Sequence, residues 1–271
     1  MARDTLPSDE DLSLRPSIIV AAHPDDEVVG LGTRLNEFQN LLAIVHVTDG
    51  APRTGPDVAN AGFATWRQYA DQRRKEFESA MREARARPGR KLCFWCPDQR
   101  AIYGIASHTR RLAALFERVH PQYVFTHPYE GGHPDHDAAA VSVHAAVALL
   151  RNAGRAAPLI LEFASYHNSC TGLESERFLD DSEAPVRDRV LNSEQQNLKQ
   201  NVFRCYASQQ KVLAWFPIKR EPVRLAPAYD FTSPPHEGQL LYETFGLGLT
   251  GKHWRRVAAK TLRNMHRGLT L

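Results

Sequence analysis

Short apolar runs alternate with amphipathic segments over roughly the first 165 residues of the chain. The runs lie at about residues 18–22, 43–47, 91–96, 123–126 and 159–163. Their length and composition predict buried strands. Between them, apolar residues recur at helical spacing, over about residues 30–42, 63–87, 107–119 and 134–150. This alternation is typical of a parallel sheet, so we expect an α/β fold, a Rossmann-like three-layer sandwich with a mostly parallel central sheet.

The pattern is looser after about residue 165. Residues 192–206 predict a helix with Ser193 as its cap, whereas residues 216–243 carry five prolines and predict extended loops. Residues 251–271 predict a basic amphipathic helix. We therefore expect a polar N-terminal tail, one main domain and a loop-rich C-terminal extension packed on it, over residues 1–16, 17–210 and 211–271.

Charge and composition exclude several classes of protein. The 271 residues include 34 basic and 31 acidic ones, and a net charge of +3 does not predict nucleic-acid binding. Apolar runs stay shorter than the roughly 18 residues of a membrane span, and residues 1–16 do not resemble a signal peptide, so we expect a cytoplasmic protein. The basic C-terminal helix could touch a membrane surface, but such a run is more often a solvated helix face.

The first predicted strand runs directly into a dense group of titratable residues. His23 is followed by Asp25, Asp26 and Glu27. Left unpaired beside apolar surroundings, this group would be costly. Imidazole and carboxylate are both good zinc ligands, so the cluster predicts a divalent metal site.

Polar clusters also follow the other predicted strands. In an open parallel sheet, ligands bind outside the carboxyl ends of the strands. The clusters at residues 23–26, 48–50, 97–98 and 127–136 therefore fall on one rim.

A second motif, His133-Pro134-Asp135-His136, follows the fourth predicted strand. Pro134 suits the first turn of a helix, and two histidines three residues apart can face one cavity. One could bind metal while the other meets the substrate, with Asp135 or another carboxylate orienting the free imidazole and raising its pKa. The alternative, a capping turn with surface histidines, is disfavoured because the first motif faces the same rim.

The two motifs together resemble the LmbE/PIG-L family of zinc-dependent de-N-acetylases, which act mostly on N-acetylglucosamine-containing conjugates. The resemblance covers roughly residues 17–210 and makes that range a catalytic domain. It includes further positions in the long helix and near the end of the domain: Arg73, Glu76, Lys199, Ser208 and Gln209.

The resemblance also implies a role for each motif residue. His23, Asp26 and His136 would bind zinc or another divalent metal such as Fe²⁺, leaving a coordination position open for water. Asp25 would be the general base, and His133 would stabilise the oxyanion and protonate the leaving amine. The resemblance, rather than spacing, decides between the two aspartates as ligand.

Four further residues have open alternatives. His127 could replace His136 as a metal ligand or lie behind the ligands, and Glu27 could cap the next helix or bond a ligand histidine. Arg53 and Asp98 lie on the rim and could bind sugar hydroxyls or a phosphate, or could be a solvated loop arginine and a turn aspartate.

The expected substrate is a small amino-sugar conjugate. Family members acting on thiol-precursor glycosides carry a tyrosine two residues before the first histidine of the second motif. Here that position is Gly131 and the nearest tyrosine is Tyr129, so the resemblance does not support that substrate. Alternatives are a thiol-conjugate amidase, an acylase on a non-sugar amide and a non-catalytic Rossmann-like binding module. The proline- and aromatic-rich residues 210–271 would either read a substituent at the reducing end of the sugar or only pack on the sheet.

Overall fold

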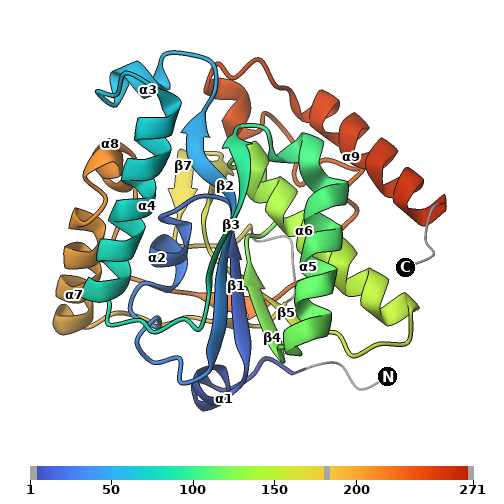
Figure 1. Ribbon diagram of the computed structural model, residues 1–271, viewed down its shortest axis with the longest axis horizontal. Helices are drawn as coiled ribbons and strands as arrows, with labels where there is room; N and C mark the ends of the chain where they lie inside the picture. Colours follow the sequence, from blue (N-terminus) through green and yellow to red (C-terminus); the bar gives the residue numbers. More distant parts are fainter. Residues whose placement is uncertain (1–4, 180–183, 268–271) are drawn as a thin grey trace.

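A seven-stranded sheet runs through the centre of the computed structural model, which describes residues 5–179 and 184–267 (Figure 1). Its strand order is β3-β2-β1-β4-β5-β9-β8; the first five strands are parallel, and β9 pairs antiparallel with both β5 and β8. The strands are β1 (Ser17–Ala21), β2 (Leu41–Pro52), β3 (Lys91–Asp98), β4 (Tyr123–Thr126), β5 (Leu159–Phe163), β8 (Val186–Arg187) and β9 (Val223–Leu225). All five strands predicted from apolar runs are present.

Helices cover both faces of the sheet, which confirms the three-layer α/β prediction (Figure 1). One face carries α2 (Asp26–Leu31), α4 (Trp66–Glu83) and α7 (Ser193–Arg204). The other carries α5 (Ile105–Val119), α6 (Pro134–Asn152) and α9 (Gly251–Arg267).

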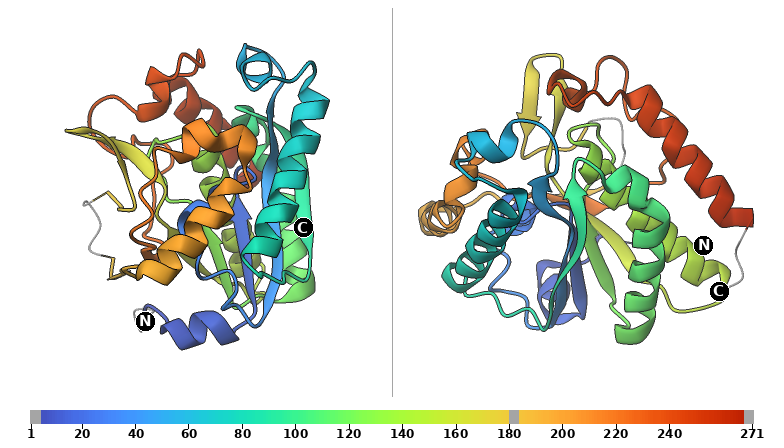
Figure 2. Two further views of the ribbon diagram at one scale, coloured as in Figure 1. Left: turned by 90° about the vertical axis from the view of Figure 1, so that its left-hand side faces the viewer. Right: turned by 45° about the horizontal axis from the view of Figure 1, so that its top comes forward.

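Short elements connect these layers. The hairpin of β6 and β7 projects away from the main sheet (Figure 2). The short elements are α1 (Asp9–Leu14), α3 (Asp57–Asn60), η1 (Ala101–Gly104), β6 (Tyr166–Ser169), β7 (Gly172–Ser175), η2 (Ala207–Gln209), α8 (Gln210–Leu213) and η3 (Leu241–Thr244).

Strand β1 is buried on both faces because it lies in the middle of the parallel strands. Ile18 and Val20 pack into the core beneath α5 and α6, whereas Ile19 packs into the core beneath α2 and α4. Pairing with β2 and β4 fixes its register, so the residues that follow Ala21 emerge at the carboxyl rim of the sheet. The first polar motif is therefore held at that rim by a rigid core strand.

The helix predicted over residues 30–42 ends much earlier, at Leu31. Beyond it, the backbone N–H and the hydroxyl of Thr33 both donate to the buried Glu221 carboxylate, at 2.8 and 2.6 Å. That carboxylate also pairs with Lys199 at 3.2 Å. The backbone thus satisfies its donors with a side chain from the C-terminal segment, and local spacing alone overestimates the helix.

The segment predicted as extended loops contributes a strand to the main sheet. Strand β9 pairs antiparallel with β5, and Arg224 donates to Glu162 across the pair at 2.8 Å in a buried ion pair. A strand of three residues between two prolines is too short for a recognisable alternation. The C-terminal extension is thus built into the central sheet as well as packed on it.

The predicted N-terminal tail also has structure. Ser8 caps α1 through a capping box, and Leu12 is buried in the core. Residues 1–4 of the predicted tail and residues 268–271 of the predicted basic helix lie outside the described residues.

Helix α9 packs through its apolar side and leaves its cations exposed. Trp254 is fully buried, and its indole N–H donates to the Pro134 carbonyl oxygen at 3.0 Å. Lys252, Arg256 and Lys260 point to solvent. Within the described residues, no helix combines the length and apolar character that crossing a membrane requires.

Burial of His108 on α5 gives the fold a testable acid sensitivity. Burial, and secondarily Arg111, lowers the pKa of His108 to about 4, against about 6.5 in an unfolded chain. As pH falls below 6.5, the unfolded state takes up this proton first, so stability present above that pH is lost towards pH 4. Between pH 7 and 5 we expect His108 to contribute about 2 kcal/mol of the loss in free energy of unfolding. Urea unfolding should show a smaller loss for His108→Phe; an equal loss in both proteins would contradict this.

Candidate metal centre and catalytic cavity

A cavity of about 600 Å³ opens at the carboxyl rim of the parallel strands. Its polar side comes from both sequence motifs, and its opposite side comes from α4 and the C-terminal segment. The residues from the motifs and the rim are His23, Asp25, Asp26, Asp98, His133 and His136. The structure therefore brings together residues that are more than 100 positions apart, as expected for motifs that follow the carboxyl ends of parallel strands.

Asp26 is the centre of this arrangement. One carboxylate oxygen lies 3.3 Å from Nδ1 of His23, and the other lies 3.2 Å from Nε2 of His136. Burial alone would raise the pKa of Asp26, but His136, His127 and His23 hold it well below its usual range. An anionic carboxylate between two imidazoles is a suitable donor set for a divalent cation.

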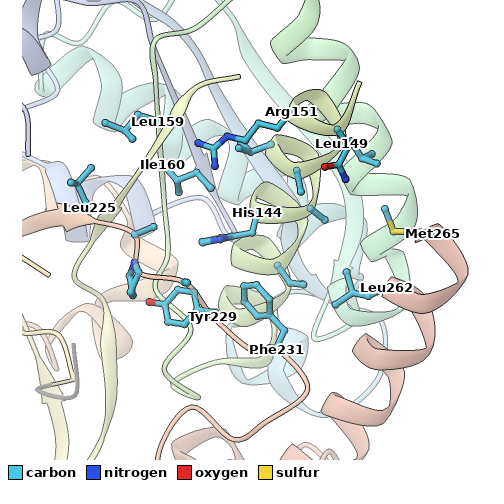
Figure 3. Close-up of a pocket in the computed structure, with 18 residues that line it drawn as sticks. His144, Leu149, Arg151, Leu159, Ile160, Leu225, Tyr229, Phe231, Leu262 and Met265 are labelled. Atoms are coloured by element: carbon cyan, nitrogen blue, oxygen red, sulfur yellow. The ribbon is translucent and has the colours of Figure 1, made fainter. Parts of the chain in front are cut away.

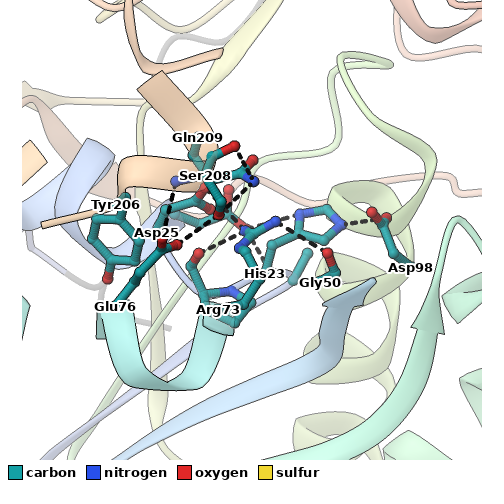
Figure 4. Close-up of polar contacts among 12 residues, drawn as sticks. His23, Asp25, Gly50, Arg73, Glu76, Asp98, Tyr206, Ser208 and Gln209 are labelled. Carbon is teal, nitrogen blue, oxygen red and sulfur yellow. Dashed lines mark hydrogen bonds and ion pairs between the residues drawn. The ribbon is translucent and has the colours of Figure 1, made fainter. Parts of the chain in front are cut away.

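Hydrogen bonds orient the two histidines toward Asp26. Nε2 of His23 lies 3.1 Å from Asp98 and 3.3 Å from Asp135, on the side of the ring away from Asp26, and Nδ1 lies on the Asp26 side (Figure 4). Although burial opposes it, the attraction of Asp98 and Asp26 raises the pKa of His23 well above its usual value, and a bound metal would take the place of the proton on Nδ1. Nδ1 of His136 contacts the Ser165 hydroxyl at 3.1 Å, which leaves Nε2 for Asp26. Outer partners of this kind fix the tautomer and ring orientation of metal-binding histidines. The donor chemistry of His23, Asp26 and His136 therefore suits a divalent metal. Among the described residues, the groups whose candidate ligand atoms all lie within 4.8 Å of one another are His23 with His133 and His136, Asp26 with His127 and His136, and His23 with Asp98, His133 and Asp135.

His127 lies close to the same carboxylate but is engaged differently. Its ring stacks on that of His136 with centroids 4.0 Å apart, and its Nε2 lies 3.3 Å from Asp26. The same Nε2 accepts the backbone N–H of Ala22 at 3.0 Å. A lone pair that accepts an amide proton is not free for a metal, which favours His136 over His127 as the third ligand.

Asp25 begins α2 in an unusual backbone conformation. Its φ of 139° is in a region that L residues rarely adopt. Arg73 from α4 holds it there, donating to the Asp25 carboxylate at 3.0 Å, to the Pro24 carbonyl at 2.7 Å and to the Gly50 carbonyl at 3.1 Å (Figure 4). Burial raises the pKa of Asp25 to about 8 even though Arg73 opposes the shift. A strained, buried carboxylate beside a candidate metal site has the character of a catalytic base.

Arg73 and Glu76 hold two different parts of the cavity wall from the same helix. Both are buried on one face of α4. Glu76 accepts from the backbone N–H and the hydroxyl of Ser208 at 2.9 and 2.6 Å, which ties η2 to the cavity wall (Figure 4). The family pattern in the sequence singles out these residues without giving their partners; the structure shows one holding Asp25 and the other holding the C-terminal wall.

His133 lines the cavity as predicted, but its surroundings differ from the expectation. The backbone N–H of Asp135 donates to Nδ1 of His133 at 3.2 Å, whereas the Asp135 carboxylate accepts from the backbone N–H groups of Gln99 and Ala101 at 2.6 and 2.9 Å. Burial, reinforced by His23, lowers the pKa of His133 to about 3. Asp135 and Asp98 do act to raise this pKa, as predicted, but burial outweighs their attraction and the net shift is downward.

The two predicted substrate-binding residues are already engaged within the protein. Asp98 lines the cavity, but its carboxylate contacts His23. Arg53 pairs with Asp49 at 2.5 and 3.1 Å, lies 3.6 Å above the Trp66 ring and is not among the described residues that line the cavity.

Glu27 accepts the backbone N–H of Asp25, the N-cap residue of α2, at 3.3 Å, but it bonds none of the proposed ligand histidines. It bonds His46 at 2.9 Å and accepts from the Tyr206 hydroxyl at 2.7 Å, so it joins β2 to the C-terminal segment behind the cavity. Both partners are distant in sequence, which is why no local pattern indicates them.

Gly131, two residues before His133, is a strained position for a tyrosine in this backbone. Gly131 has φ +70°, and a side chain there would come within 2.7 Å of Leu240. Tyr129 instead donates its hydroxyl to the Ser233 carbonyl at 2.9 Å, away from the cavity residues.

Comparisons with solved structures agree on the fold. The chain is similar to the A40926 pseudoaglycone deacetylase Dbv21, at 17% identity and a TM-score of 0.59 over 80% of this chain and 98% of that one. It is also similar to the N,N'-diacetylchitobiose deacetylase from Pyrococcus horikoshii, at 18% identity and a TM-score of 0.54 over 80% and 85%. The 4-carboxy-2-hydroxymuconate hydratase GalB from Pseudomonas putida gives 17% and 0.56 over 79% and 98%. Since a hydratase shares this fold with deacetylases, the fold alone does not decide the reaction.

The family comparison is more specific. The comparison with curated protein sequences gave no match. Residues 18–147 match the family model of PIG-L, described as GlcNAc-PI de-N-acetylase. This range contains His23, Asp25, Asp26, His133 and His136. Residues 18–147 therefore match the PIG-L (LmbE-like) family that the sequence predicts.

Proposed function

We propose that this protein is a metal-dependent hydrolase that removes an N-acetyl or other N-acyl group from an amino-sugar conjugate. The observation that carries the proposal is the juxtaposition of Asp25 and Asp26 on one cavity wall. Asp26 lies between two oriented histidines, and Asp25 is held beside it by Arg73. A binding module without turnover has no need for a strained, buried carboxylate next to a metal site.

His23, Asp26 and His136 would hold the metal, with zinc as the preferred ion and Fe²⁺ as an alternative. When bound, the ion would lower the pKa of a water and polarise the amide carbonyl. Its positive charge would also favour the ionised form of Asp25, against the burial that raises the pKa of that group in the metal-free protein.

Asp25 then carries the proton. It accepts the proton of the attacking water as the O–C bond forms, and it can return that proton to the leaving nitrogen as the C–N bond breaks. His133 accepts a backbone N–H at Nδ1, so its proton is on Nε2. A neutral Nε2–H is a fixed hydrogen-bond donor for the oxyanion. Oxyanion stabilisation is thus the role that the structure favours for His133, and protonation of the amine is shared with or taken by Asp25.

The far side of the cavity indicates what else the substrate carries. Apolar and aromatic residues from the C-terminal segment face the metal-binding side across the cavity, namely Val212, Leu213, Trp215, Phe216, Phe245 and Leu247. Trp215 is 46% exposed at this wall. These residues suit an apolar substituent at the reducing end of the sugar, so we propose a glycoside rather than free N-acetylglucosamine as the substrate.

The proposal is tested by incubating the metal-loaded enzyme with a set of N-acyl amino sugars and their glycosides and measuring the free amine released. Metal content is determined on the same sample, and Asp25→Asn serves as the control for contaminating activity. Release from thiol conjugates or simple N-acyl amines alone would instead indicate one of the alternative amidases. No amine release from any substrate by fully loaded enzyme would contradict the proposal.

Removing the exposed aromatic side chain should reveal recognition of the substituent. We expect Trp215→Ala to lower kcat/KM for an aryl glycoside of N-acetylglucosamine roughly tenfold, with little change for the free sugar, because one aromatic contact is lost. Binding energy from a remote group can orient the amide, so kcat should fall as well as affinity. Trp95→Ala is the matched control, since Trp95 is 57% exposed and does not line this cavity. Equal effects of Trp215→Ala on both substrates would show that this wall of the cavity does not recognise the substituent.

A further inference from the structure

A second cavity, of about 760 Å³, lies between α6, α9 and the segment that follows β9 (Figure 3). It shares no lining residue with the catalytic cavity. It contacts the C-terminal half of α6 and the first residues of β5, whereas the catalytic cavity contacts the N-terminus of α6. The two sites are therefore at opposite ends of the parallel strands.

The walls of this second cavity are mostly apolar. Leu225 and Phe231 contribute from the segment around β9, and Leu262 and Met265 contribute from α9 (Figure 3). Its volume is in the range of clefts that bind small molecules, roughly 300–1,000 Å³. No carboxylate is among the described residues that line it. An apolar or anionic ligand fits these walls better than a cation.

His144 places an unused polar group inside the cavity. Its ring packs edge-on against those of Tyr229 and Phe231, at centroid distances of 5.4 and 5.3 Å. Nε2 is buried and has no hydrogen-bond partner among the described residues. Burial, together with Arg151, lowers the pKa of His144 to about 4, so at neutral pH the imidazole is uncharged. A buried nitrogen without a partner is costly, and a bound ligand would supply one.

Arg151 supplies the charge at the rim of the cavity. It is exposed in the last turn of α6, seven residues after His144, and so lies two turns away on the same face. Helical side chains lean toward the N-terminus, and both side chains project from α6 toward the β5 side of the cavity (Figure 3). No ion pair or hydrogen bond engages the guanidinium within residues 5–179 and 184–267.

We propose that this cavity binds a single-chain fatty carboxylate. The carboxylate lies between the guanidinium of Arg151 and Nε2–H of His144, and the alkyl chain lies against Phe231, Leu262 and Met265. The guanidinium is well suited to a carboxylate, and the neutral imidazole donates a second hydrogen bond. The site is independent of the proposed amidase reaction, because none of its residues lines the catalytic cavity.

Calorimetric titration of the full-length protein with dodecanoate, below its micellar concentration, tests the site directly. We expect saturable binding of one dodecanoate per chain. Each methylene removed, in decanoate and octanoate, should weaken binding roughly fourfold, the effect of one buried CH₂. Dodecyltrimethylammonium, which has the same chain and the opposite charge, should not bind.

Variants locate the site. Arg151→Gln should weaken dodecanoate binding roughly ten- to a hundredfold through loss of a charge-assisted hydrogen bond. Ala148→Trp should abolish binding, because Ala148 is exposed and lines the cavity. The matched control is Arg118→Gln, an exposed arginine in the last turn of the neighbouring α5, which should bind as wild type. Asp25→Asn should also bind as wild type, since it changes only the catalytic cavity.

Three results would overturn the proposal. They are absence of saturable dodecanoate binding, equal binding by wild type and Arg151→Gln, and loss of binding in Asp25→Asn, which would place the chain in the catalytic cavity. Binding to anionic vesicles without binding to monomeric dodecanoate would also count against it, because the basic face of α9 would then be the attracting surface. Since Arg151 is exposed, its substitution tests the site even if Ala148→Trp fails to fold.

Discussion

Alanine at Asp26 or at His136 is expected to remove most of the bound metal and nearly all of the amidase activity. Each change leaves two protein ligands where a hydrolytic zinc site uses three. Asp26 is the stronger case, because its carboxylate contacts both His23 and His136 and supplies the negative charge of the proposed centre. Elemental analysis of the purified variants, after equilibration with a small excess of zinc, measures the effect.

His127→Ala is the matched control for this experiment. His127 is as near to Asp26 as His23 is, at 3.3 Å, but its Nε2 accepts the Ala22 N–H. We expect metal content close to wild type, with at most a modest loss of affinity as the ring stacked on His136 is removed. Full occupancy in Asp26→Ala or His136→Ala would contradict the assignment. An empty site in His127→Ala would make His127 the third ligand instead.

The residues at the carboxyl rim of the sheet could be predicted from the sequence because the pattern that identifies them is local. An apolar run that ends in polar residues identifies both a strand and its exit, and parallel strands place all such exits on one side. Ile18–Ala22 followed by His23, and Tyr123–Thr126 followed by His127, both carry this signal. Convergence of the two motifs in one cavity follows from topology alone and is what the structure shows.

The partners of the site residues could not be predicted, because they depend on side-chain contacts between distant segments. Asp98 lines the cavity, but its contact with His23, 75 residues earlier, could not be predicted. Arg73 was recognisable only as part of a family pattern, although it holds Asp25 from 48 residues away. Hydrophobic periodicity and local residue spacing describe neighbours in the sequence, so they do not indicate such pairs.

The errors in the predicted secondary structure also come from contacts between distant segments. Thr33 leaves the predicted helix because Glu221, 188 residues later, accepts its backbone N–H and its hydroxyl. Strand β9 exists because β5 offers it an edge. In both places a contact between distant segments overrides the local preference, and both contacts join residues 211–271 to the preceding part of the chain.

Arg73 makes Asp25 a suitable position for a conservative substitution. The guanidinium is buried and donates to one Asp25 oxygen, the Pro24 carbonyl and the Gly50 carbonyl. Alanine at Asp25 would leave a buried charge without its counter-ion, which is strongly destabilising. Asparagine keeps an oxygen that accepts from Arg73 and removes only the ability to hold a proton.

Asp25→Asn is therefore expected to fold and to bind metal as wild type does, but to lose about two to four orders of magnitude in kcat, the usual contribution of a general acid–base group. His133→Ala is the informative comparison, since loss of one oxyanion donor costs about two to three orders of magnitude. If His133 acts only as a neutral donor, the basic limb of the pH–rate profile should persist in His133→Ala; its loss would show that protonated His133 is the general acid. Near-normal turnover by metal-loaded Asp25→Asn would remove Asp25 as the base. The carboxylate that Arg73 holds at φ 139° would then serve only to begin α2.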